Sequence, residues 1–333
     1  MGKLDNQQLQ KLLNYIKTNK QVIIPPMIGG DAGVHRLGNQ LLVISTDPCT
    51  GVPLKWFGWF LINYASSDLS LFGAKPQFCT INLLGPKTID TKIFEDIMKQ
   101  TCAAADEYDI AIVRGHTGMY DSINDLLGVC TVYGIVEPDK LVTPKNAKPG
   151  DLIMCTKPVG IETLTNFVLT HPKTAEKLFG AEKTEKISNM VKLQSCVWEA
   201  QQLAEMGCVN AMHDATEGGL VVALNELSEA SGIGFRVCWD DIPILEDVLE
   251  LQKQFGFSDE QVLALSSTGL VLAAVPPLLK NVAVEVLSKL GLCAYFIGEF
   301  TKDKSRVFVK AGKEKVFPVF IEDVYARLLA FKE

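Results

Sequence analysis

The stretch Met212-His213-Asp214-Ala215-Thr216-Glu217-Gly218-Gly219-Leu220 places an imidazole, two carboxylates, a hydroxyl and a glycine pair within nine residues. Leucines follow at Leu220, Leu224 and Leu227, which is the spacing of one face of an α-helix. The glycines permit the close approach of a backbone or a ligand. The pattern therefore predicts a polar, glycine-rich loop that leads directly into an amphipathic helix.

The cap of that helix decides how the loop is interpreted. Thr216 or Asp214 can serve as N-cap, and Glu217 then lies in the first turn, where the helix dipole favours a negative charge. One interpretation is a capped helix entry with no further role. The other is a loop at a helix N-terminus that accepts a phosphorylated ligand. His213 is either a general acid/base or a structural histidine at the helix entry.

Whole-chain composition excludes several classes of protein. The 333 residues are enough for two domains, and 47% hydrophobic with 21% charged residues is typical of a globular protein. The net charge of −7 argues against a nucleic-acid partner. The N-terminus lacks an apolar signal region, and no apolar run is long enough to span a membrane. We expect a cytoplasmic protein.

The cysteines do not follow a disulfide or metal-binding pattern. There are nine, an odd number, and no two of them form a CxxC pair. Cys130 and Cys155 lie in apolar, strand-like runs, where cysteine behaves as a small hydrophobe. Buried, reduced thiols are expected.

Strands and helices alternate along the first half of the chain. Residues 41–47 are predicted to be a buried strand that ends at Asp47, and residues 56–72 a mostly apolar helix. A second strand, a helix, a third strand running into Arg114-Gly115-His116-Thr117, and a last strand follow; their predicted ranges are 77–84, 89–107, 110–113 and 126–136. This order predicts a ferredoxin-like or related α+β layer rather than a doubly wound sheet.

A proline- and lysine-rich segment, residues 138–151, reads as a connector between two domains. We place the boundary so that residues 1–148 form an N-terminal domain and residues 149–333 a C-terminal α/β domain. The predicted strands of the second half cover 152–156, 233–239, 270–275, 294–297 and 307–309, and its predicted helices include 162–169, 184–206, 245–255, 281–290 and 321–331.

Three isolated aspartates, Asp31, Asp47 and Asp68, each lie where an apolar segment meets a polar turn. Carboxylates at such places suit Mg²⁺, which combines a few protein carboxylates with the oxygens of a bound phosphate. The alternative is three unrelated surface aspartates. The chain has neither a G-x-x-x-x-G-K-[ST] loop nor a G-x-G-x-x-G loop, so the common nucleotide-binding loops are absent.

The order of motifs resembles the aminoimidazole ribonucleotide (AIR) synthetase superfamily, whose fold is called PurM-like. The resemblance covers essentially the whole chain, and the opening stretch is most similar to the hydrogenase-maturation branch and to AIR synthetase-related proteins. The motifs are Gly29-Gly30-Asp31-Ala32, Ser45-Thr46-Asp47, residues 67–76, Arg114-Gly115-His116-Thr117, Lys148-Pro149-Gly150-Asp151, Met212–Leu220 and Ser267-Thr268-Gly269.

The resemblance implies an N-terminal domain that binds ATP and dimerises through its sheet, and a C-terminal α/β domain that closes over the nucleotide. It implies ATP- and Mg²⁺-dependent phosphorylation or activation of a carbonyl or similar oxygen on a small molecule. The apolar content of residues 56–84, which one small sheet would struggle to cover, also favours a homodimer. Carried over by position, the metal ligands would be Asp31, Asp47 and Asp68; the nucleotide would contact Thr46, Gly115, His116, Thr117, Thr216 and Gly218; and His213, Asp214 and Glu217 would be catalytic.

Three departures from the family pattern bear on turnover. Gly30 and His116 stand where many members carry acids, so two potential metal ligands are replaced. The sequence ends Ala330-Phe331-Lys332-Glu333, whereas the dehydratase branch ends in a reactive cysteine, so we expect a diffusible substrate. A selenophosphate synthetase fits poorly because no cysteine precedes Cys49. A purine-pathway synthetase also fits poorly, and a nucleotide-binding accessory or regulatory protein without turnover is the alternative to an enzyme.

Overall fold

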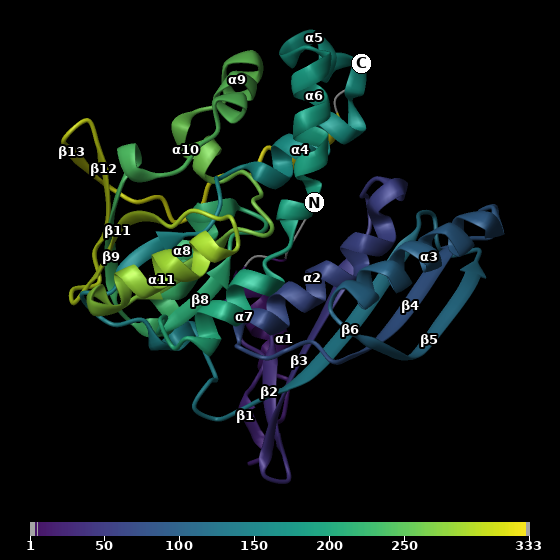
Figure 1. Ribbon diagram of the computed structural model, residues 1–333, viewed down its shortest axis with the longest axis horizontal. Coiled ribbons are helices and arrows are strands. Elements are labelled where there is room, and N and C mark those ends of the chain that lie inside the picture. The colour runs from purple at the N-terminus through teal and green to yellow at the C-terminus, as the bar shows by residue number, and fades with distance from the viewer. Residues whose placement is uncertain (1–3, 5, 331–333) are drawn as a thin grey trace. The chain divides into compact units, whose positions relative to one another are not determined.

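A computed structural model describes Leu4 and residues 6–330, which divide into two compact units. The N-terminal unit comprises residues 16–26 and 30–141. The C-terminal unit comprises residues 27–29 and the chain from Val142 onward, together with the segment that ends at Tyr15. The chain therefore passes from one unit to the other between Gly29 and Gly30, inside one of the quoted motifs. Each unit has its own sheet (Figure 1).

The N-terminal unit contains a six-stranded sheet in the order β1-β2-β3-β6-β4-β5. Only the pair β4–β5 is parallel, and the helix α3 (Thr91–Glu107) connects these two strands. The helix α2 (Phe57–Leu71) connects β3 to β4. The strands are β1 (Val22–Ile24), β2 (Gly33–Leu37), β3 (Gln40–Cys49), β4 (Phe78–Pro86), β5 (Ala111–Tyr120) and β6 (Leu127–Val136). The two-domain α/β prediction, with helices layered on a sheet, is confirmed.

Close packing explains why α2 is apolar on nearly all sides. It packs on β3 and β6 of the sheet and against α3, and almost all of its residues are buried. Gly58 allows the close approach of the two helices, because a Cβ atom there would collide with the Ile97 carbonyl oxygen of α3. Gly128 has the same role on β6, where a Cβ would meet Leu61 and Phe57 of α2. Alternate strand residues, including Cys130 and Val132, complete this core.

The C-terminal unit contains a seven-stranded sheet in the order β13-β12-β9-β11-β7-β10-β8. Two hydrophobic cores lie in this unit, one at the sheet and one among α4, α9 and the C-terminal segment. The strands are β7 (Leu152–Cys155), β8 (Ala211–Asp214), β9 (Gly234–Cys238), β10 (Val271–Val275), β11 (Tyr295–Thr301), β12 (Arg306–Lys310) and β13 (Lys313–Val316). The helices are α1 (Asn6–Leu13), α4 (Ile161–Thr170), α5 (Pro172–Phe179), α6 (Ala181–Ser188), α7 (Val197–Glu205), α8 (Gly219–Ser231), α9 (Glu246–Phe255), α10 (Asp259–Leu263), α11 (Lys280–Lys289) and α12 (Tyr325–Leu329).

The predicted N-cap of the helix after the opening stretch was wrong. Asp214 ends strand β8, and α8 begins only at Gly219, with Gly218 as its N-cap at a φ of 79°. Glu217 consequently lies before the helix and not in its first turn. A left-handed glycine supplies the turn where we expected a capping side chain. The general feature, a polar loop that leads into an amphipathic helix, is confirmed.

The structure also places several other helix and strand boundaries differently from the prediction. The helix predicted over 184–206 is broken into α6, a 3-10 turn at Asn189–Gln194, and α7. Strand β3 continues through Asp47 to Cys49, and β5 includes the Arg114–Thr117 motif that was placed after a strand. Six cysteines are buried as expected, Cys238 is intermediate, and Cys102 and Cys293 are exposed.

Within the part of the chain that the structure describes, no helix is both long and apolar enough to cross a membrane. Residues 331–333, on which the expectation about a terminal cysteine partly rests, lie outside the described residues.

Candidate functional site

Two of the predicted metal ligands face the same layer of the N-terminal unit. Ser45 and Asp47 are two residues apart on β3, so their side chains share one face of the sheet, the face that α2 covers. The Ser45 hydroxyl donates a hydrogen bond to Asp68 Oδ2 of α2 at 3.1 Å. Both aspartates are half-buried. Strand and helix therefore bring Asp47 and Asp68 to the same side of β3.

Asp31 belongs to the same unit and lies just before β2. The antiparallel register pairs Gly33 of β2 with Ile44 of β3, which directs the preceding residues toward the Ser45–Asp47 part of β3. Asp47 and Asp68 offer carboxylate oxygens on one side of β3, and oxygen is the ligand that Mg²⁺ requires. The chemistry of these donors fits Mg²⁺.

Thr46 and His116 lie on the opposite face of the same sheet. Thr46 and Thr131 of β6 share a hydrogen bond at 2.8 Å between their hydroxyl oxygens. His116 Nε2 lies 2.7 Å from the Tyr120 hydroxyl on β5. The cross-strand register pairs His116 with Asn82, a residue of the face that the unit's helices leave open. The predicted nucleotide contacts are thus divided between the two faces.

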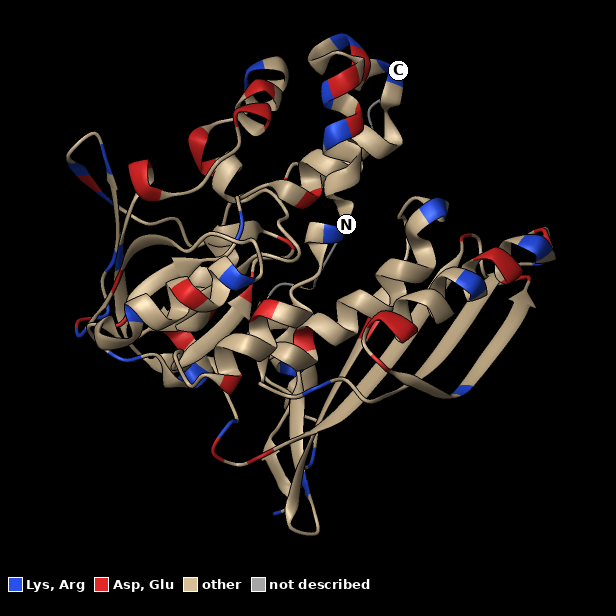
Figure 2. Cartoon of the chain, viewed as in Figure 1, with Lys and Arg blue, Asp and Glu red and all other residues tan. Residues whose placement is uncertain are grey.

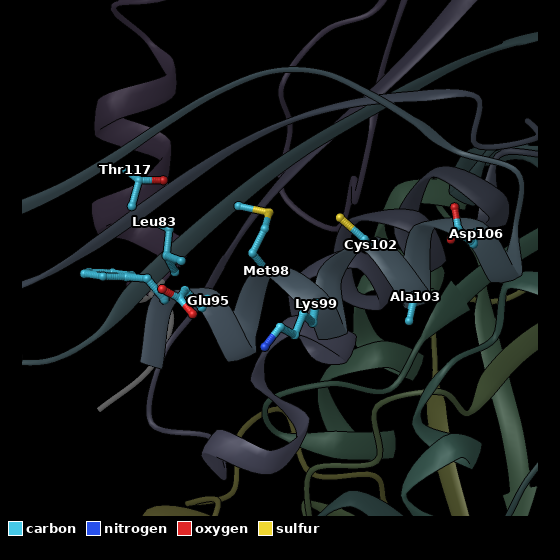
Figure 3. Close-up of a pocket in the computed structure, with 9 residues that line it drawn as sticks. Leu83, Glu95, Met98, Lys99, Cys102, Ala103, Asp106 and Thr117 are labelled. Atoms are coloured by element: carbon cyan, nitrogen blue, oxygen red, sulfur yellow. The ribbon is translucent and has the colours of Figure 1, made fainter. Parts of the chain in front are cut away.

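Gly115 and Thr117 share the helix-covered face with Asp47 but lie three strands away from it. Strands β6 and β4 separate β5 from β3, and three steps of about 4.8 Å amount to about 14 Å. Thr117 instead lines a shallow groove of about 720 Å³ beside α3, with Leu83, Met98 and other mainly apolar side chains (Figure 3). Within one chain, the structure does not bring Gly115–Thr117 to the aspartates.

In the C-terminal unit, β8 and α8 hold a buried histidine between acids. His213 Nε2 lies 2.8 Å from Glu226 Oε2 of α8, and Nδ1 lies 3.6 Å from Asp214 Oδ1. His213 and Asp214 are almost fully buried and both pair with β10. With Glu226 ionised, Nε2 carries the hydrogen and donates it to the carboxylate, which fixes the orientation of the ring. The ring is thus buried in a fixed orientation between β8 and α8.

The rest of the opening stretch forms the turn into α8. Thr216 is half-buried, Glu217 is exposed, and Gly218 is buried. The Gly218 amide donates to Asp323 Oδ2 at 3.2 Å, and the Ser266 hydroxyl donates to the same oxygen at 2.6 Å. The turn is therefore held by a carboxylate from the C-terminal segment of the chain.

A buried carboxyl, Glu162 of α4, lies in the same region. It accepts hydrogen bonds from the Thr268 hydroxyl at 2.6 Å and from the Thr268 amide at 3.2 Å. The pKa of Glu162 is raised to about 7 despite these bonds. Burial is the main cause, and the charges of Glu217 and Asp323 contribute to the same rise. Burial also raises the pKa of Asp323, against the lowering effect of its hydrogen bonds. This part of the unit concentrates acids that influence one another.

A buried ion pair fixes the turn that carries Thr268. Lys157 Nζ contacts the Glu199 carboxylate and donates to the carbonyl oxygens of Ser195 at 2.6 Å and Gly269 at 2.8 Å. Lys157 and Glu199 are each less than 6% exposed. The pair joins the end of β7 and the start of α7 to the Ser267–Gly269 turn.

Sequence reasoning missed Glu162, Glu226, Asp323 and the Lys157–Glu199 pair. The contacts that give these residues their roles join positions 13 to 106 apart in the sequence, so no local pattern reveals them. The Ser267-Thr268-Gly269 motif was the one available signal, because its hydroxyl and amides require acceptors once the turn is buried.

Comparison with known proteins accounts for this arrangement. Residues 29–136 match the N-terminal domain of AIR synthase related proteins, and residues 148–310 match their C-terminal domain. The chain belongs to the AIR synthase related family. The two matches together span most of the chain, and both candidate regions lie within them.

Named relatives of this family member come from several branches. It is 27% identical to a putative hydrogenase expression/formation protein of Methanocaldococcus jannaschii, over 84% of this chain and 82% of that protein. It is 28% identical to selenide, water dikinase of Carboxydothermus hydrogenoformans, over 93% and 95%. Its fold matches the crystal structure of the hydrogenase maturation protein HypE in complex with ATP, with a TM-score of 0.73, 21% identity and coverage of 91% and 92%. The predicted PurM-like fold and hydrogenase-maturation likeness are confirmed.

Proposed function

We propose that the protein is an ATP- and Mg²⁺-dependent enzyme that phosphorylates or activates the carbonyl or amide oxygen of a small diffusible substrate. The observation that carries this proposal is the placement of Asp47 and Asp68 on one face of β3, linked through Ser45. Two half-buried carboxylates on the same side of β3 offer the kind of oxygen donors that Mg²⁺ combines with the oxygens of a bound phosphate. A relative named as a dikinase and a neighbour crystallised with ATP support a nucleotide as the ligand.

Asp31, Asp47 and Asp68 would hold the metal. When bound there, Mg²⁺ neutralises charge on the phosphate oxygens. The γ-phosphoryl group would form a bond to the substrate oxygen as its bond to the β-phosphate oxygen breaks, which leaves ADP. Thr46, on the opposite face of β3, and Gly115–Thr117, three strands away, are left out of this proposed site, because one chain does not bring them to Asp47.

The polar stretch of the C-terminal unit would act on the substrate. Thr216 and the Gly218 turn would contact phosphate oxygens at the start of α8. His213, oriented by Glu226, would accept or return the proton of the reacting group. Asp214 and Glu217 would complete the catalytic set.

A turnover assay tests the enzymatic proposal. The purified protein, ATP and Mg²⁺ are incubated with a panel of small carboxamides and carboxylates, and release of ADP and phosphate is followed. Turnover that depends on one substrate and falls at least about tenfold in His213→Asn is the expected result, given typical contributions of positioned general acids and bases. Tight ATP binding without stimulated turnover would favour the accessory or regulatory alternative.

We also propose a homodimer formed through the open sheet face of the N-terminal unit. Both helices of this unit pack on the other face, and β4 and β6 carry no charged residue (Figure 2). Phe78 is 42% and Ile44 37% exposed there, and Phe78 stacks on Tyr133 with ring centroids 5.6 Å apart. An apolar face of this kind is typical of an interaction surface, and a second copy would cover it with its own equal face.

Light scattering tests the dimer. The wild type should have about twice the 36.5 kDa chain mass. Phe78→Asp should shift it toward the monomer because a buried charge in the interface would be unpaired. Leu278→Asp, at a 97% exposed position in the other unit, is the matched control and should remain dimeric. A wild-type monomer at micromolar concentrations would contradict this proposal.

A further inference from the structure

The C-terminal segment contributes one carboxylate that connects three parts of the C-terminal unit. Asp323 Oδ2 accepts from the Gly218 amide at 3.2 Å and from the Ser266 hydroxyl at 2.6 Å. Its other oxygen, Oδ1, accepts from the Tyr325 amide at 2.9 Å. Asp323 thus joins the turn before α8, the turn before β10 and its own segment.

The turn before α8 is bonded to neighbouring segments as well as to itself, where the Gly219 amide donates to the Thr216 carbonyl at 2.8 Å. Gly218, the N-cap, makes no side-chain cap hydrogen bond, and the first amides of a helix have no partner within it. On the other side of Glu217, the Ala215 amide donates to the Leu270 carbonyl, and the Ala215 carbonyl accepts from the Ser267 amide. Glu217 therefore lies between an anchored Ala215 and an amide that Asp323 anchors.

The turn also has no room to move inward. A Cβ atom at Gly219 would collide with the Leu265 carbonyl oxygen, and Gly219 itself has a φ of 53°. The backbone of Gly219 packs directly against the backbone of residues 263–265. The turn can therefore move only away from those residues. The Asp323 carboxylate opposes that outward movement.

Asp323 can act as an anchor because its own segment is firmly packed. Val324 and Leu328 are buried in a core cluster with side chains of α4 and α9. The Tyr325 hydroxyl accepts from Asn166 Nδ2 of α4 at 2.8 Å. The packed C-terminal segment holds the Asp323 carboxylate in place, and the carboxylate accepts a hydrogen bond from the turn before α8.

The acids around this turn give it a charge that depends on pH. Glu162 on α4, Glu217 in the turn, and Asp323 and Tyr325 on the C-terminal segment are the titratable groups that act on one another. Burial is the main cause of the raised pKa of Glu162, and the neighbouring carboxylates add to it. Ionisation of Glu162 near neutral pH would therefore add a repulsive charge close to Glu217 and Asp323.

We propose that Asp323 is a positioning residue that fixes Glu217 and the Gly218 amide for the reaction, by tying the turn before α8 to the packed C-terminal segment. The proposal rests on the proposed function for its catalytic consequence. The anchoring itself does not depend on it. Neither Asp323 nor its segment lies within the stretch, residues 148–310, that matches the family's C-terminal domain.

The test compares Asp323→Ala, Asp323→Asn and the control Glu322→Gln, an exposed neighbour. Hydrogen–deuterium exchange of residues 215–219 is measured first. Exchange at the Gly218 amide should be at least about tenfold faster in Asp323→Ala, because one hydrogen bond to a charged acceptor is lost. Asp323→Asn keeps an acceptor and should be intermediate, and Glu322→Gln should match the wild type. Exchange in Asp323→Ala equal to wild type would overturn the proposal.

Kinetics then separates positioning from a purely structural role. The maximal turnover should fall in the order wild type, Asp323→Asn, Asp323→Ala, and the KM for ATP should rise in the same order because the Gly218 turn is a proposed phosphate contact, while exchange at the Leu328 amide stays at the wild-type rate. If Asp323→Ala lowers the exchange protection of all amides equally, including that of Leu328 in the C-terminal segment, the role of Asp323 is structural only and the proposal is contradicted. If the wild type has no ATP-dependent turnover, the proposed function fails, and the exchange experiment still decides whether Asp323 anchors the turn.

Discussion

Acids in the two units of this protein are accommodated in different ways. Asp47 and Asp68 in the N-terminal unit are half-buried and lie on one side of a strand, as oxygen donors around a cation would. Glu162 and Asp323 in the C-terminal unit accept hydrogen bonds from amides and hydroxyls of neighbouring turns. We propose that the first region binds a metal–nucleotide ligand, whereas hydrogen bonds within the chain organise the second.

The largest stability effect should come from breaking the buried pair of the C-terminal unit. Lys157→Met would leave the Glu199 carboxylate buried without its cation and should destabilise the protein by about 3–5 kcal/mol. Lys186→Met removes an exposed partner of Glu182 four residues away and should cost at most about 0.5 kcal/mol. Urea unfolding measures both. A loss below about 1 kcal/mol for Lys157→Met would show that the region tolerates an uncompensated acid.

The second effect is the pH dependence of stability that Glu162 confers. Its pKa rises from an ordinary 4.5 to about 7 in the folded protein, so the folded state holds the proton more tightly. The associated stability is fully present below pH 4.5 and is lost as pH rises through 7; 2.5 pKa units correspond to on the order of 3 kcal/mol.

Glu162→Gln removes the titrating group and should flatten this part of the profile. Unfolding free energies at pH 5 and pH 8 provide the comparison, with Glu322→Gln as the exposed control. If the slope between these pH values is the same in Glu162→Gln and the wild type, Glu162 is not the group responsible.

A smaller effect is expected from the partner of His213. Glu226→Ala removes the acceptor 2.8 Å from Nε2 and leaves a buried ring N–H unsatisfied, at a cost of about 1–3 kcal/mol. Glu226→Gln retains an acceptor and should lose less than half of that. Thermal unfolding ranks the three proteins. Equal stability of Glu226→Ala and the wild type would mean that water or another group replaces the carboxylate.

The sequence was sufficient to predict the two-domain α/β fold, because hydrophobic periodicity marks strands such as β3 and helices such as α2 and α3. It also identified Asp47, Asp68 and the His213–Gly218 stretch as candidates. It misplaced the start of α8, since Gly218 reaches a left-handed conformation that competes with side-chain capping. Alternation along the predicted strand already separates Thr46 from Asp47 by face, but the face that the helices cover is known only from the structure.

Long-range partners could not be predicted for a different reason. Glu226 and Asp323 contact residues 13 and 105 positions away, and their importance arises only when the chain is packed. No local pattern distinguishes them from solvated acids such as Glu322. The role of Gly115–Thr117 remains a prediction, because within one chain β6 and β4 lie between this stretch and Asp47.

The central claim, a metal–nucleotide site at Asp47 and Asp68, is tested most directly by thermal unfolding with ATP, with and without Mg²⁺. At ATP about a hundredfold above its dissociation constant, the wild type with Mg²⁺ should gain about 2.7 kcal/mol. Asp47→Asn should unfold within about 0.5 kcal/mol of the wild type without ligand and should lose most of the gain, whereas the exposed control Asp139→Asn should keep it. A Mg²⁺-dependent gain that persists unchanged in Asp47→Asn, or no gain in the wild type, would contradict the account.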